Sequence, residues 1–319
     1  MTRRLISIVV PARNEEGCLA DLHEAVKAAL DSEPYDWELI VVDDGSTDAT
    51  ARVIAELAAA DPRVRGLHLA RGFGQQAALI AGMEDSRGAA IVTMDADLEQ
   101  PPAAIVTMLR EWERGSDIVH GVRVDHPDTS WWKRATSRSF YRVFSFLTRM
   151  PMEPGMLDFR LLDRRVANAL VSMPEADFFL RGLATWVGFR QARVRYEAGL
   201  RRAGATKFGT RAMLGFALRG ITSFSTFPLR LATYIGVTMT FLSIAYGAYV
   251  GVMHFVWRSP QPGYASTILL VSFLMGVQFL LIGVLGEYVA RIHVEVKRRP
   301  RYLVARRTNG AGPADGDEP

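Results

Sequence analysis

The chain has 319 residues, of which 49% are hydrophobic and 23% charged, which allows one large domain or two smaller ones. The net charge is +4, and this mildly basic balance, combined with two long apolar segments, favours a membrane surface over a nucleic acid as partner. The single cysteine, Cys18, excludes an internal disulfide. The N-terminus is basic and then briefly apolar, too short for a secretion signal, so we expect the N-terminal domain to stay in the cytoplasm.

Residues 4–122 alternate between apolar runs and amphipathic stretches. The expected strands are 5–10, 38–42, 64–69, 89–94 and 118–122, and the expected helices lie near 15–31, 47–60, 74–86 and 102–114. The strands are nearly continuously apolar, as in a parallel sheet covered on both faces. The alternation predicts an α/β fold with right-handed βαβ units in a doubly wound, mostly parallel sheet. The first strand is not followed by Gly-x-Gly-x-x-Gly, which argues against a nicotinamide dehydrogenase.

Acidic residues follow the second and fourth of these strands. Asp43 ends the second strand, and Asp95 and Asp97 follow the fourth. Parallel strands present their carboxyl ends at one edge of a sheet, where ligands of open α/β sheets bind. Two carboxylates one residue apart can both reach Mg²⁺ or Mn²⁺, which prefer oxygen ligands and leave room for substrate phosphates. The alternative is a polar turn in which Asp97 or Glu99 interacts with the N-terminus of the next helix.

Basic and aromatic residues alternate over segment 131–144, which predicts a basic helix. Lys133, Ser137 and Arg138 lie about one turn apart and can share a face. Such a helix suits a membrane interface or an anionic head group, and the alternative is a solvated basic face over an aromatic core. Further on, the strand-like segment 158–164 begins with Asp158, which is either part of the site or a structural hydrogen-bond acceptor.

The last third of the chain carries the membrane signals. Residues 201–209 form a basic, glycine-containing loop suited to phosphates or simply to solvent, and 211–227 have the spacing of an amphipathic helix lying on a membrane. Residues 231–257 and 264–286 contain no Asp, Glu, Lys or Arg, and each exceeds the roughly 20 residues needed to cross a bilayer. Lys and Arg cluster before the first segment and after the second, which predicts a hairpin with both ends in the cytoplasm.

In this order, these features resemble the family-2 glycosyltransferases. More narrowly, the chain is similar to the polyprenyl-phosphate glycosyltransferases related to dolichyl-phosphate mannose synthase and the bacterial undecaprenyl-phosphate glucosyl- and aminoarabinosyl-transferases. The resemblance covers about residues 5–295, and its motifs are VVPARNEE at 9–16, VDDGSTD at 42–48, DADL at 95–98, PP at 101–102, DFRLLDR at 158–164, FFLRGL at 178–183, and SFS at 223–225 with PLR at 228–230.

The resemblance implies a GT-A type nucleotide-diphospho-sugar domain at 1–207 and an amphipathic juxtamembrane helix at 208–228. It further implies two transmembrane helices within 229–291, and a basic, then disordered, cytoplasmic tail at 292–319. The protein would be a multi-pass protein of the cytoplasmic (inner) membrane, with its catalytic domain and both termini on the cytoplasmic side. A homo-oligomer is implied as well, with a tetramer as one candidate.

The resemblance also implies roles for individual residues. The nucleotide-sugar would be lined by Pro11, Arg13, Glu15, Asp43, Asp95 and Ala96. Mg²⁺ or Mn²⁺ would be held by Asp97, the firmest ligand, with Asp95 and Glu99. The catalytic residues would be Asp97, Asp158, which would lie near the reacting sugar, and Arg123, which would face the donor phosphates. The phosphate of the acceptor lipid would be bound by Lys133, Ser137 and Arg201. The sequence departs from the family pattern at Gln75, where Lys is frequent, at Lys133, where Arg is usual, and at Glu99, where Gln is common.

The implied reaction moves a hexose from a nucleotide-diphospho-sugar, with UDP-glucose favoured, to polyprenyl (undecaprenyl) phosphate, and inverts the anomeric carbon. The lipid-linked sugar would then serve transfer across the membrane. The alternative is a GDP-mannose-dependent polyprenyl-phosphate mannose synthase. A processive polysaccharide synthase would need further spans and a Gln-x-x-Arg-Trp motif, which the sequence lacks. A non-catalytic, membrane-anchored nucleotide-sugar-binding protein is disfavoured by the intact acidic strand ends.

Overall fold

The computed structural model describes residues 3–124, 155–175, 180–198, 227–257 and 263–308. The predicted basic helix at 131–144, the loop at 201–209 and the amphipathic helix at 211–227 lie outside these residues. The chain divides into two compact units, one formed by residues 1–213 and 299–319 and the other by residues 214–298.

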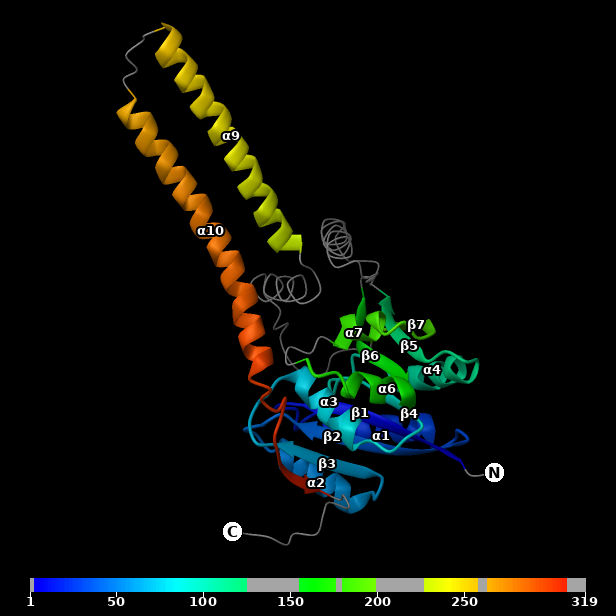
Figure 1. Cartoon of the computed structure of the whole chain (residues 1–319). Helices are drawn as coiled ribbons and strands as arrows, with labels where there is room; N and C mark the ends of the chain where they lie inside the picture. Colours follow the sequence, from blue (N-terminus) through cyan, green and yellow to red (C-terminus); the bar gives the residue numbers. More distant parts are fainter. Residues whose placement is uncertain (1–2, 125–154, 176–179, 199–226, 258–262, 309–319) are drawn as a thin grey trace. The chain divides into compact units, whose positions relative to one another are not determined.

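The first unit is built on one eight-stranded sheet (Figure 1). Its strand order is β7-β5-β6-β4-β1-β2-β3-β8. The neighbours β4/β6, β5/β6 and β3/β8 are antiparallel, and the other neighbours are parallel. The strands are β1 (Arg4–Ala12), β2 (Tyr35–Asp43), β3 (Val64–Leu69), β4 (Ala90–Thr93), β5 (Ile118–Val124), β6 (Met156–Asp163), β7 (Gln191–Glu197) and β8 (Val304–Thr308). The predicted doubly wound, mostly parallel sheet is confirmed.

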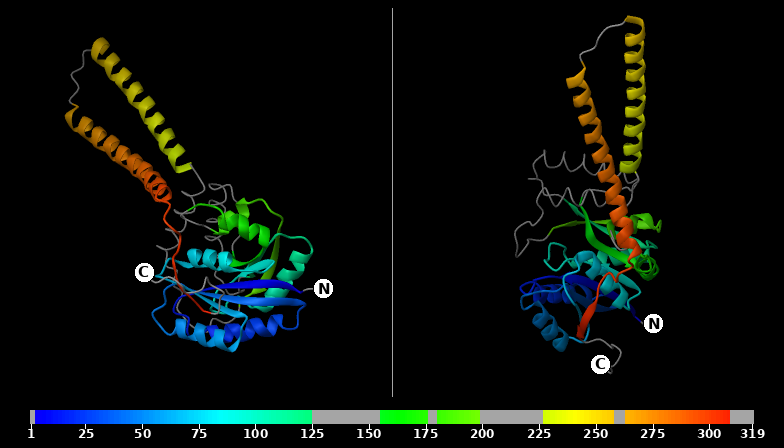
Figure 2. Two further views of the ribbon diagram at one scale, coloured as in Figure 1. Left: turned by 60° about the horizontal axis from the view of Figure 1, so that its bottom comes forward. Right: turned by 60° about the vertical axis from the view of Figure 1, so that its left-hand side comes forward.

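Helices cover both faces of this sheet (Figure 2). One face carries α1 (Leu19–Leu30), α2 (Thr50–Ala60) and α4 (Ala103–Glu113), and the other carries α3 (Gln75–Asp85), α6 (Arg164–Val171) and α7 (Leu180–Trp186). Burial on both faces explains the continuous apolar runs of β1 and β2. Gly82 of α3 lets that helix approach β1, because a Cβ atom there would lie 2.3 Å from Cγ1 of Val9.

The C-terminal segment departs from the expected tail. Residues 304–308 form β8, which pairs with β3 at the edge of the sheet. Just before this strand, the Arg301 side chain donates hydrogen bonds to the carbonyl groups of Val171 and Glu175, and the Tyr302 hydroxyl donates to Glu84. The basic segment after the second apolar helix is therefore part of the first unit as far as Thr308.

The second unit consists of two long helices, α9 (Phe227–Trp257) and α10 (Tyr264–Val296). Both are long and apolar enough to cross a membrane, over Phe227–Tyr249 and Phe273–Val296, and neither stretch is buried in the protein. On α10 the less exposed residues recur at alternating spacings of three and four, which marks the side facing α9. These residues are Leu274, Val277, Leu281, Val284, Tyr288 and Arg291.

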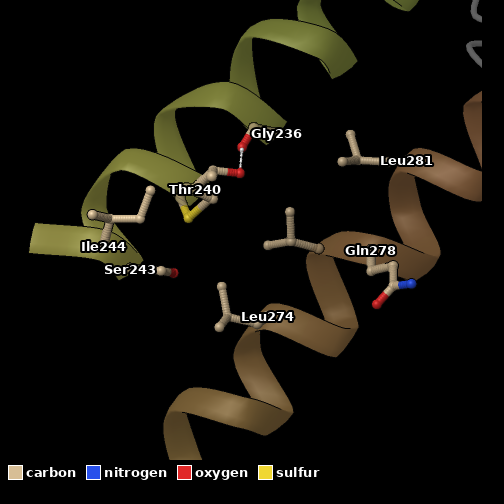
Figure 3. A pocket seen from close by; sticks show the side chains of 9 residues that line it. Gly236, Thr240, Ser243, Ile244, Leu274, Gln278 and Leu281 are labelled. Atoms are coloured by element: carbon tan, nitrogen blue, oxygen red, sulfur yellow. Dashed lines mark hydrogen bonds between the residues drawn. The ribbon is translucent and has the colours of Figure 1, made fainter. Parts of the chain in front are cut away.

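Packing between α9 and α10 is incomplete. A cavity of about 530 Å³ separates them at mid-helix, with Ile244 and Thr240 on one wall and Leu274 and Leu281 on the other (Figure 3). The Thr240 hydroxyl donates to the carbonyl oxygen of Gly236 at 2.9 Å, so this polar group is satisfied within its own helix. The two helices are therefore individually suited to lipid but touch each other sparsely.

Candidate active site

A cavity of about 380 Å³ opens at the carboxyl ends of β1, β2 and β4. Strand β1 lies between the other two and is parallel to both, so the three strands end at the same edge. The lining residues come from the end of β1 and the segment after it, from the turn after β2, from the start of α3 and from the segment after β4. They are Pro11, Ala12, Arg13, Asn14, Glu15, Asp44, Gly74, Gln75, Asp95, Ala96 and Asp97. The structure thus brings five of the six residues expected to line the nucleotide-sugar to one cavity.

The exception is Asp43, whose side chain turns away from the cavity. One carboxylate oxygen accepts the backbone N–H of Ser46 at 2.9 Å, and the other lies 3.1 Å from Nδ1 of His68. Burial raises the pKa of Asp43, but these hydrogen bonds outweigh it and hold the pKa below its usual value. Asp43 therefore shapes the turn after β2 rather than the cavity surface.

Asp44 takes the place expected of Asp43 and was not singled out from the sequence. Its carboxylate lines the cavity, is almost fully buried, and accepts the backbone N–H groups of Phe73 at 2.6 Å and Gly74 at 3.0 Å. Gly45 follows with a φ of +66°, and a Cβ atom there would lie 2.5 Å from the Gly72 nitrogen. The turn after β2 is therefore fastened to the loop that precedes α3. In the sequence, Asp44 was marked only by its position next to Asp43 in the VDDGSTD motif.

Asp95, which follows β4 and also lines the cavity, lies in an acidic environment. Its carboxylate accepts hydrogen bonds from the side-chain amides of Gln75 at 2.7 Å and Gln100 at 2.6 Å. Burial, followed by the negative charges of Asp158 and Asp97, raises the pKa of Asp95 to about 7. An acid whose ionisation is opposed by neighbouring acids is well suited to a bound cation, which would neutralise that repulsion.

The segment after Asp95 is a tight, strained turn. Leu98 has a φ of +61°, an unfavourable value for a branched residue, and its side chain packs against the core. An oxygen of Asp97 accepts the backbone N–H of Glu99 at 3.1 Å. The turn thus sets Asp97 at the cavity, while its partly buried neighbour Leu98 holds the backbone in place.

Glu99 and Arg123 pair with each other. Oε2 of Glu99 lies 3.4 Å from Nη1 of Arg123. Among the described residues, no three His, Cys, Asp or Glu side chains converge on a metal position. The expected ligand trio of Asp95, Asp97 and Glu99 is therefore not assembled in advance. Magnesium is commonly held by one or two carboxylates together with substrate phosphates, a pattern that Asp95 and Asp97 fit.

Asp158, on β6, is enclosed by positive charge. It is 2% exposed. One of its oxygens accepts from Nη2 of Arg160 and Nε of Arg181, both at 3.1 Å. The other accepts from Arg181 Nη2 at 2.9 Å and from the Gln76 amide at 3.2 Å. Burial acts to raise the pKa of Asp158, but the two guanidinium groups overcome it and lower that pKa.

Three of these partners extend the site beyond the sequence analysis. Gln76 also accepts the backbone N–H of Leu180 at 3.1 Å and so joins α3 to α7, and Arg160 donates to the Leu180 carbonyl at 3.1 Å. Arg181 belongs to the FFLRGL motif, which pointed to it without giving it a role, whereas nothing marked Gln76. The residues expected to bind the acceptor phosphate, Lys133, Ser137 and Arg201, lie outside the described residues.

Two family models match the chain. Residues 7–170 match the family described as "Glycosyl transferase family 2", and residues 227–292 match "GtrB C-terminal hairpin". The chain belongs to glycosyl transferase family 2. This glycosyltransferase is 39% identical over 305 residues to the SfII prophage-derived bactoprenol glucosyl transferase of Shigella flexneri, an alignment that spans 96% of this chain and 99% of the relative. The family identified by resemblance is thereby confirmed.

A second relative agrees with this assignment, and a solved structure shares the fold. The prophage bactoprenol glucosyl transferase homolog of Escherichia coli strain K12 is 38% identical over 301 residues, covering 94% of this glycosyltransferase and 98% of the relative. The crystal structure of mannosyl-3-phosphoglycerate synthase from Rubrobacter xylanophilus aligns with a TM-score of 0.50 at 15% identity, covering 69% of this chain and 73% of the other. That structural likeness supports the GT-A type fold of the first unit.

Proposed function

We propose that this glycosyltransferase moves glucose from UDP-glucose to the phosphate of a polyprenyl lipid such as undecaprenyl phosphate. The observation that carries the proposal is the alignment with a bactoprenol glucosyl transferase over 96% of the chain, hairpin included. A polyprenol is a membrane lipid, so its transferase needs both a nucleotide-sugar site and a means of staying at the membrane. The cavity at the sheet edge and the two apolar helices answer these two needs.

The cavity suits the donor in size and chemistry. Its volume of about 380 Å³ falls within the range of ligand pockets, roughly 300–1,000 Å³. Asp44 and Asn14 offer oxygen atoms to a base or ribose, and Arg13, which is 61% exposed, supplies a positive charge at the opening. The diphosphate is proposed to lie towards Asp95 and Asp97, with Arg123 nearby.

Asp95 and Asp97 are proposed to hold Mg²⁺ or Mn²⁺ together with the donor's phosphate oxygens. Such an ion stabilises the negative charge that develops on a leaving nucleoside diphosphate. The nucleophile is an oxygen of the lipid phosphate, whose second pKa of about 6 leaves it ionised at neutral pH without a general base. Its bond to the anomeric carbon forms as the bond to the diphosphate oxygen breaks, UDP departs, and the configuration inverts.

Asp158 is proposed to position other groups rather than to move a proton. Its two oxygens accept four hydrogen bonds from Arg160, Arg181 and Gln76, and they leave little capacity for a substrate proton. The side chain of Arg181 is 22% exposed, in contrast to the fully buried Arg160. Asp158 would therefore hold Arg181 ready to meet negative charge on the donor or acceptor.

The two apolar helices are proposed to form a hairpin that keeps the catalytic unit on the cytoplasmic side. Residues 1–213 and 299–319 belong to one compact unit, so the chain between them must cross the membrane an even number of times. The cluster Lys297, Arg298, Arg299 and Arg301 after α10 favours the cytoplasm for that unit. We further propose that Lys133, Ser137 and Arg201 bind the acceptor phosphate and that the protein is a homo-oligomer, which cross-linking in detergent would test.

A donor screen tests the reaction. Purified protein in detergent, with undecaprenyl phosphate and Mn²⁺ or Mg²⁺, is offered radiolabelled UDP-glucose, UDP-galactose, UDP-N-acetylglucosamine and GDP-mannose. We expect label from UDP-glucose alone to enter organic-extractable lipid, and we expect EDTA and Asp97→Asn to abolish this transfer. Asp36→Asn, at an exposed acid on β2, is the matched control and should act as wild type. Transfer from GDP-mannose would favour the mannose synthase, and binding without transfer from any donor would contradict the proposal.

A further inference from the structure

The C-terminal strand β8 reaches the nucleotide cavity through a chain of hydrogen bonds. In the antiparallel pairing of β3 with β8, Gly66 lies opposite Thr308 and His68 opposite Arg306. Gly66 leaves room for this contact, because a Cβ atom there would lie 3.1 Å from Cβ of Thr308. The Thr308 hydroxyl lies 3.0 Å from Nε2 of His68.

His68 connects this strand to the turn after β2. The imidazole is 6% exposed, and its Nδ1 lies 3.1 Å from Oδ2 of Asp43, which is 5% exposed. A neutral imidazole has one donor and one acceptor nitrogen. Since Asp43 can only accept, Nδ1–H donates to it and Nε2 accepts from Thr308. Nη2 of Arg306 also donates to Nε2, at 3.5 Å, in agreement with this arrangement.

Asp43 connects His68 to the cavity wall through hydrogen bonds. Its other oxygen accepts the backbone N–H of Ser46 at 2.9 Å, and the Ser46 hydroxyl accepts the backbone N–H of Asn14 at 3.0 Å. Oδ1 of Asn14 accepts the N–H of Thr47 at 2.8 Å. Asn14 lines the cavity and has a φ of +57°, a left-handed conformation that Asn adopts more readily than most residues.

We propose that Thr308 and His68 are positioning residues, which act through Asp43 to fix the turn 43–47 and, with it, the wall of the nucleotide cavity. The strand that follows the apolar hairpin would thus help to build the donor site. The claim about the turn stands on the contacts above, and the claim that its ligand is a nucleoside diphosphate rests on the proposed function.

The test compares four variants of the full-length protein in detergent. Thr308→Val removes the hydroxyl and keeps the shape of the side chain, and Thr308→Ser keeps the hydroxyl. His68→Phe removes the imidazole hydrogen bonds to Asp43, Thr308 and Arg306. Arg307→Ala is the matched control, because Arg307 lies on the same strand but contacts Asp85 instead. Hydrogen–deuterium exchange of the amides at 43–47 reports the turn, and calorimetry with UDP and Mn²⁺ reports the cavity.

We expect Thr308→Val and His68→Phe to speed exchange at 43–47 and to weaken UDP binding, each by about threefold to tenfold, the scale of one net hydrogen bond. The KM for the donor should rise in parallel with the dissociation constant for UDP, while kcat stays within about twofold of the wild-type value. Thr308→Ser and Arg307→Ala should match wild type.

Equal behaviour of Thr308→Ser and Thr308→Val would overturn the proposal. Unchanged exchange at 43–47 in Thr308→Val and His68→Phe would also overturn it. So would an effect of Arg307→Ala as large as that of Thr308→Val, because strand docking rather than the Thr308–His68 contact would then be responsible. Faster exchange with unaltered UDP affinity would also overturn it. A wild-type protein that binds no UDP would instead contradict the proposed function, and the exchange data would still decide whether Thr308 fixes the turn.

Discussion

Asp95 and Asp158 stand at the same region of the sheet yet are held in opposite ways. Asp95 follows β4 and receives hydrogen bonds from two neutral glutamines, and its pKa is raised to about 7 by burial and by the charges of Asp158 and Asp97. Asp158, on β6, is even more deeply buried, yet two arginines lower its pKa. Burial is common to both, and the charge of the neighbours decides the direction.

This difference separates two tasks within one site. The carboxylates of Asp97 and Asp158 oppose the ionisation of Asp95, and a bound divalent cation would supply the positive charge that offsets this repulsion. The carboxylate of Asp158 already has two guanidinium groups as counter-charges, and it joins β6, α3 and α7 through Arg160, Arg181 and Gln76. One carboxylate is prepared for a ligand and the other supports the structure around it.

The largest effect is expected from Asp97→Asn. Removing this charge takes away a proposed cation ligand without changing side-chain size, and kcat/KM for sugar transfer should fall by about a thousandfold. Glu99→Gln sharpens the comparison, because Glu99 pairs with Arg123. A partly exposed ion pair contributes little, so its loss should change kcat/KM by less than about fivefold. Equal losses in the two variants, in a radiolabel transfer assay, would show that Glu99 is a ligand as well.

Asp158→Asn should destabilise the fold, because it removes the carboxylate charge that the buried Arg160 and the partly exposed Arg181 both contact. The expected loss is about 3–5 kcal/mol, measured by denaturant unfolding in detergent. Asp95→Asn should leave stability unchanged or raise it, since it removes a repelled charge. If Asp158→Asn does not fold, adding Arg181→Gln should recover folded protein. Equal stability of the two single variants would refute the contrast between Asp95 and Asp158.

The affinity for Mn²⁺ should depend on pH near neutrality. The raised pKa of Asp95, about 7, means that its carboxyl binds a proton below that pH, and a protonated carboxyl is a poor ligand. Mn²⁺ affinity in the presence of UDP should therefore fall as pH drops below about 7, by at most tenfold per unit, and level off above it. Electron paramagnetic resonance of free Mn²⁺ between pH 6 and 8 measures this, and Asp95→Asn should flatten the profile.

The smallest effect is expected from the adjacent pair Gln75 and Gln76. Gln76→Leu removes a buried hydrogen bond to Asp158 and leaves the Leu180 N–H without its acceptor, so it should destabilise by about 1–2 kcal/mol. Gln75→Leu removes an exposed hydrogen bond to Asp95 and should cost under about 0.5 kcal/mol. Thermal unfolding of both variants measures the difference. A larger loss of stability in Gln75→Leu than in Gln76→Leu would show that Asp95, rather than Asp158, supports the surrounding structure.

The sequence predicted those parts of the fold that carry their own local signal. Strands β1 to β5 are mostly apolar and largely buried, and their predicted bounds lie within about three residues of the observed ones. Strand β8 was missed because its residues, VARRT, lie at an edge where three of the five are exposed, so its composition resembles a basic tail. Only pairing with β3 identifies it as a strand.

The same distinction applies to the site. Asp95 and Asp97 were found because they lie two residues apart at a strand end. The partners of Asp158 were not, because Gln76 is 82 positions away in the chain and Arg181 is 23 positions away. The roles of Asp43 and Asp44 were exchanged for a related reason. Both lie at the end of one strand, and the partners that fix their side chains, His68 for Asp43 and the backbone of Phe73 and Gly74 for Asp44, are distant in the sequence.

The most direct test of the account is the calorimetric affinity of the protein for UDP with and without Mn²⁺, in wild type and in Asp97→Asn. If the acids after β4 hold a cation together with the diphosphate, Mn²⁺ should tighten UDP binding to wild type by at least about tenfold and should have no effect on Asp97→Asn. UDP affinity that is indifferent to Mn²⁺ in wild type, or that responds to Mn²⁺ equally in the variant, would contradict the account.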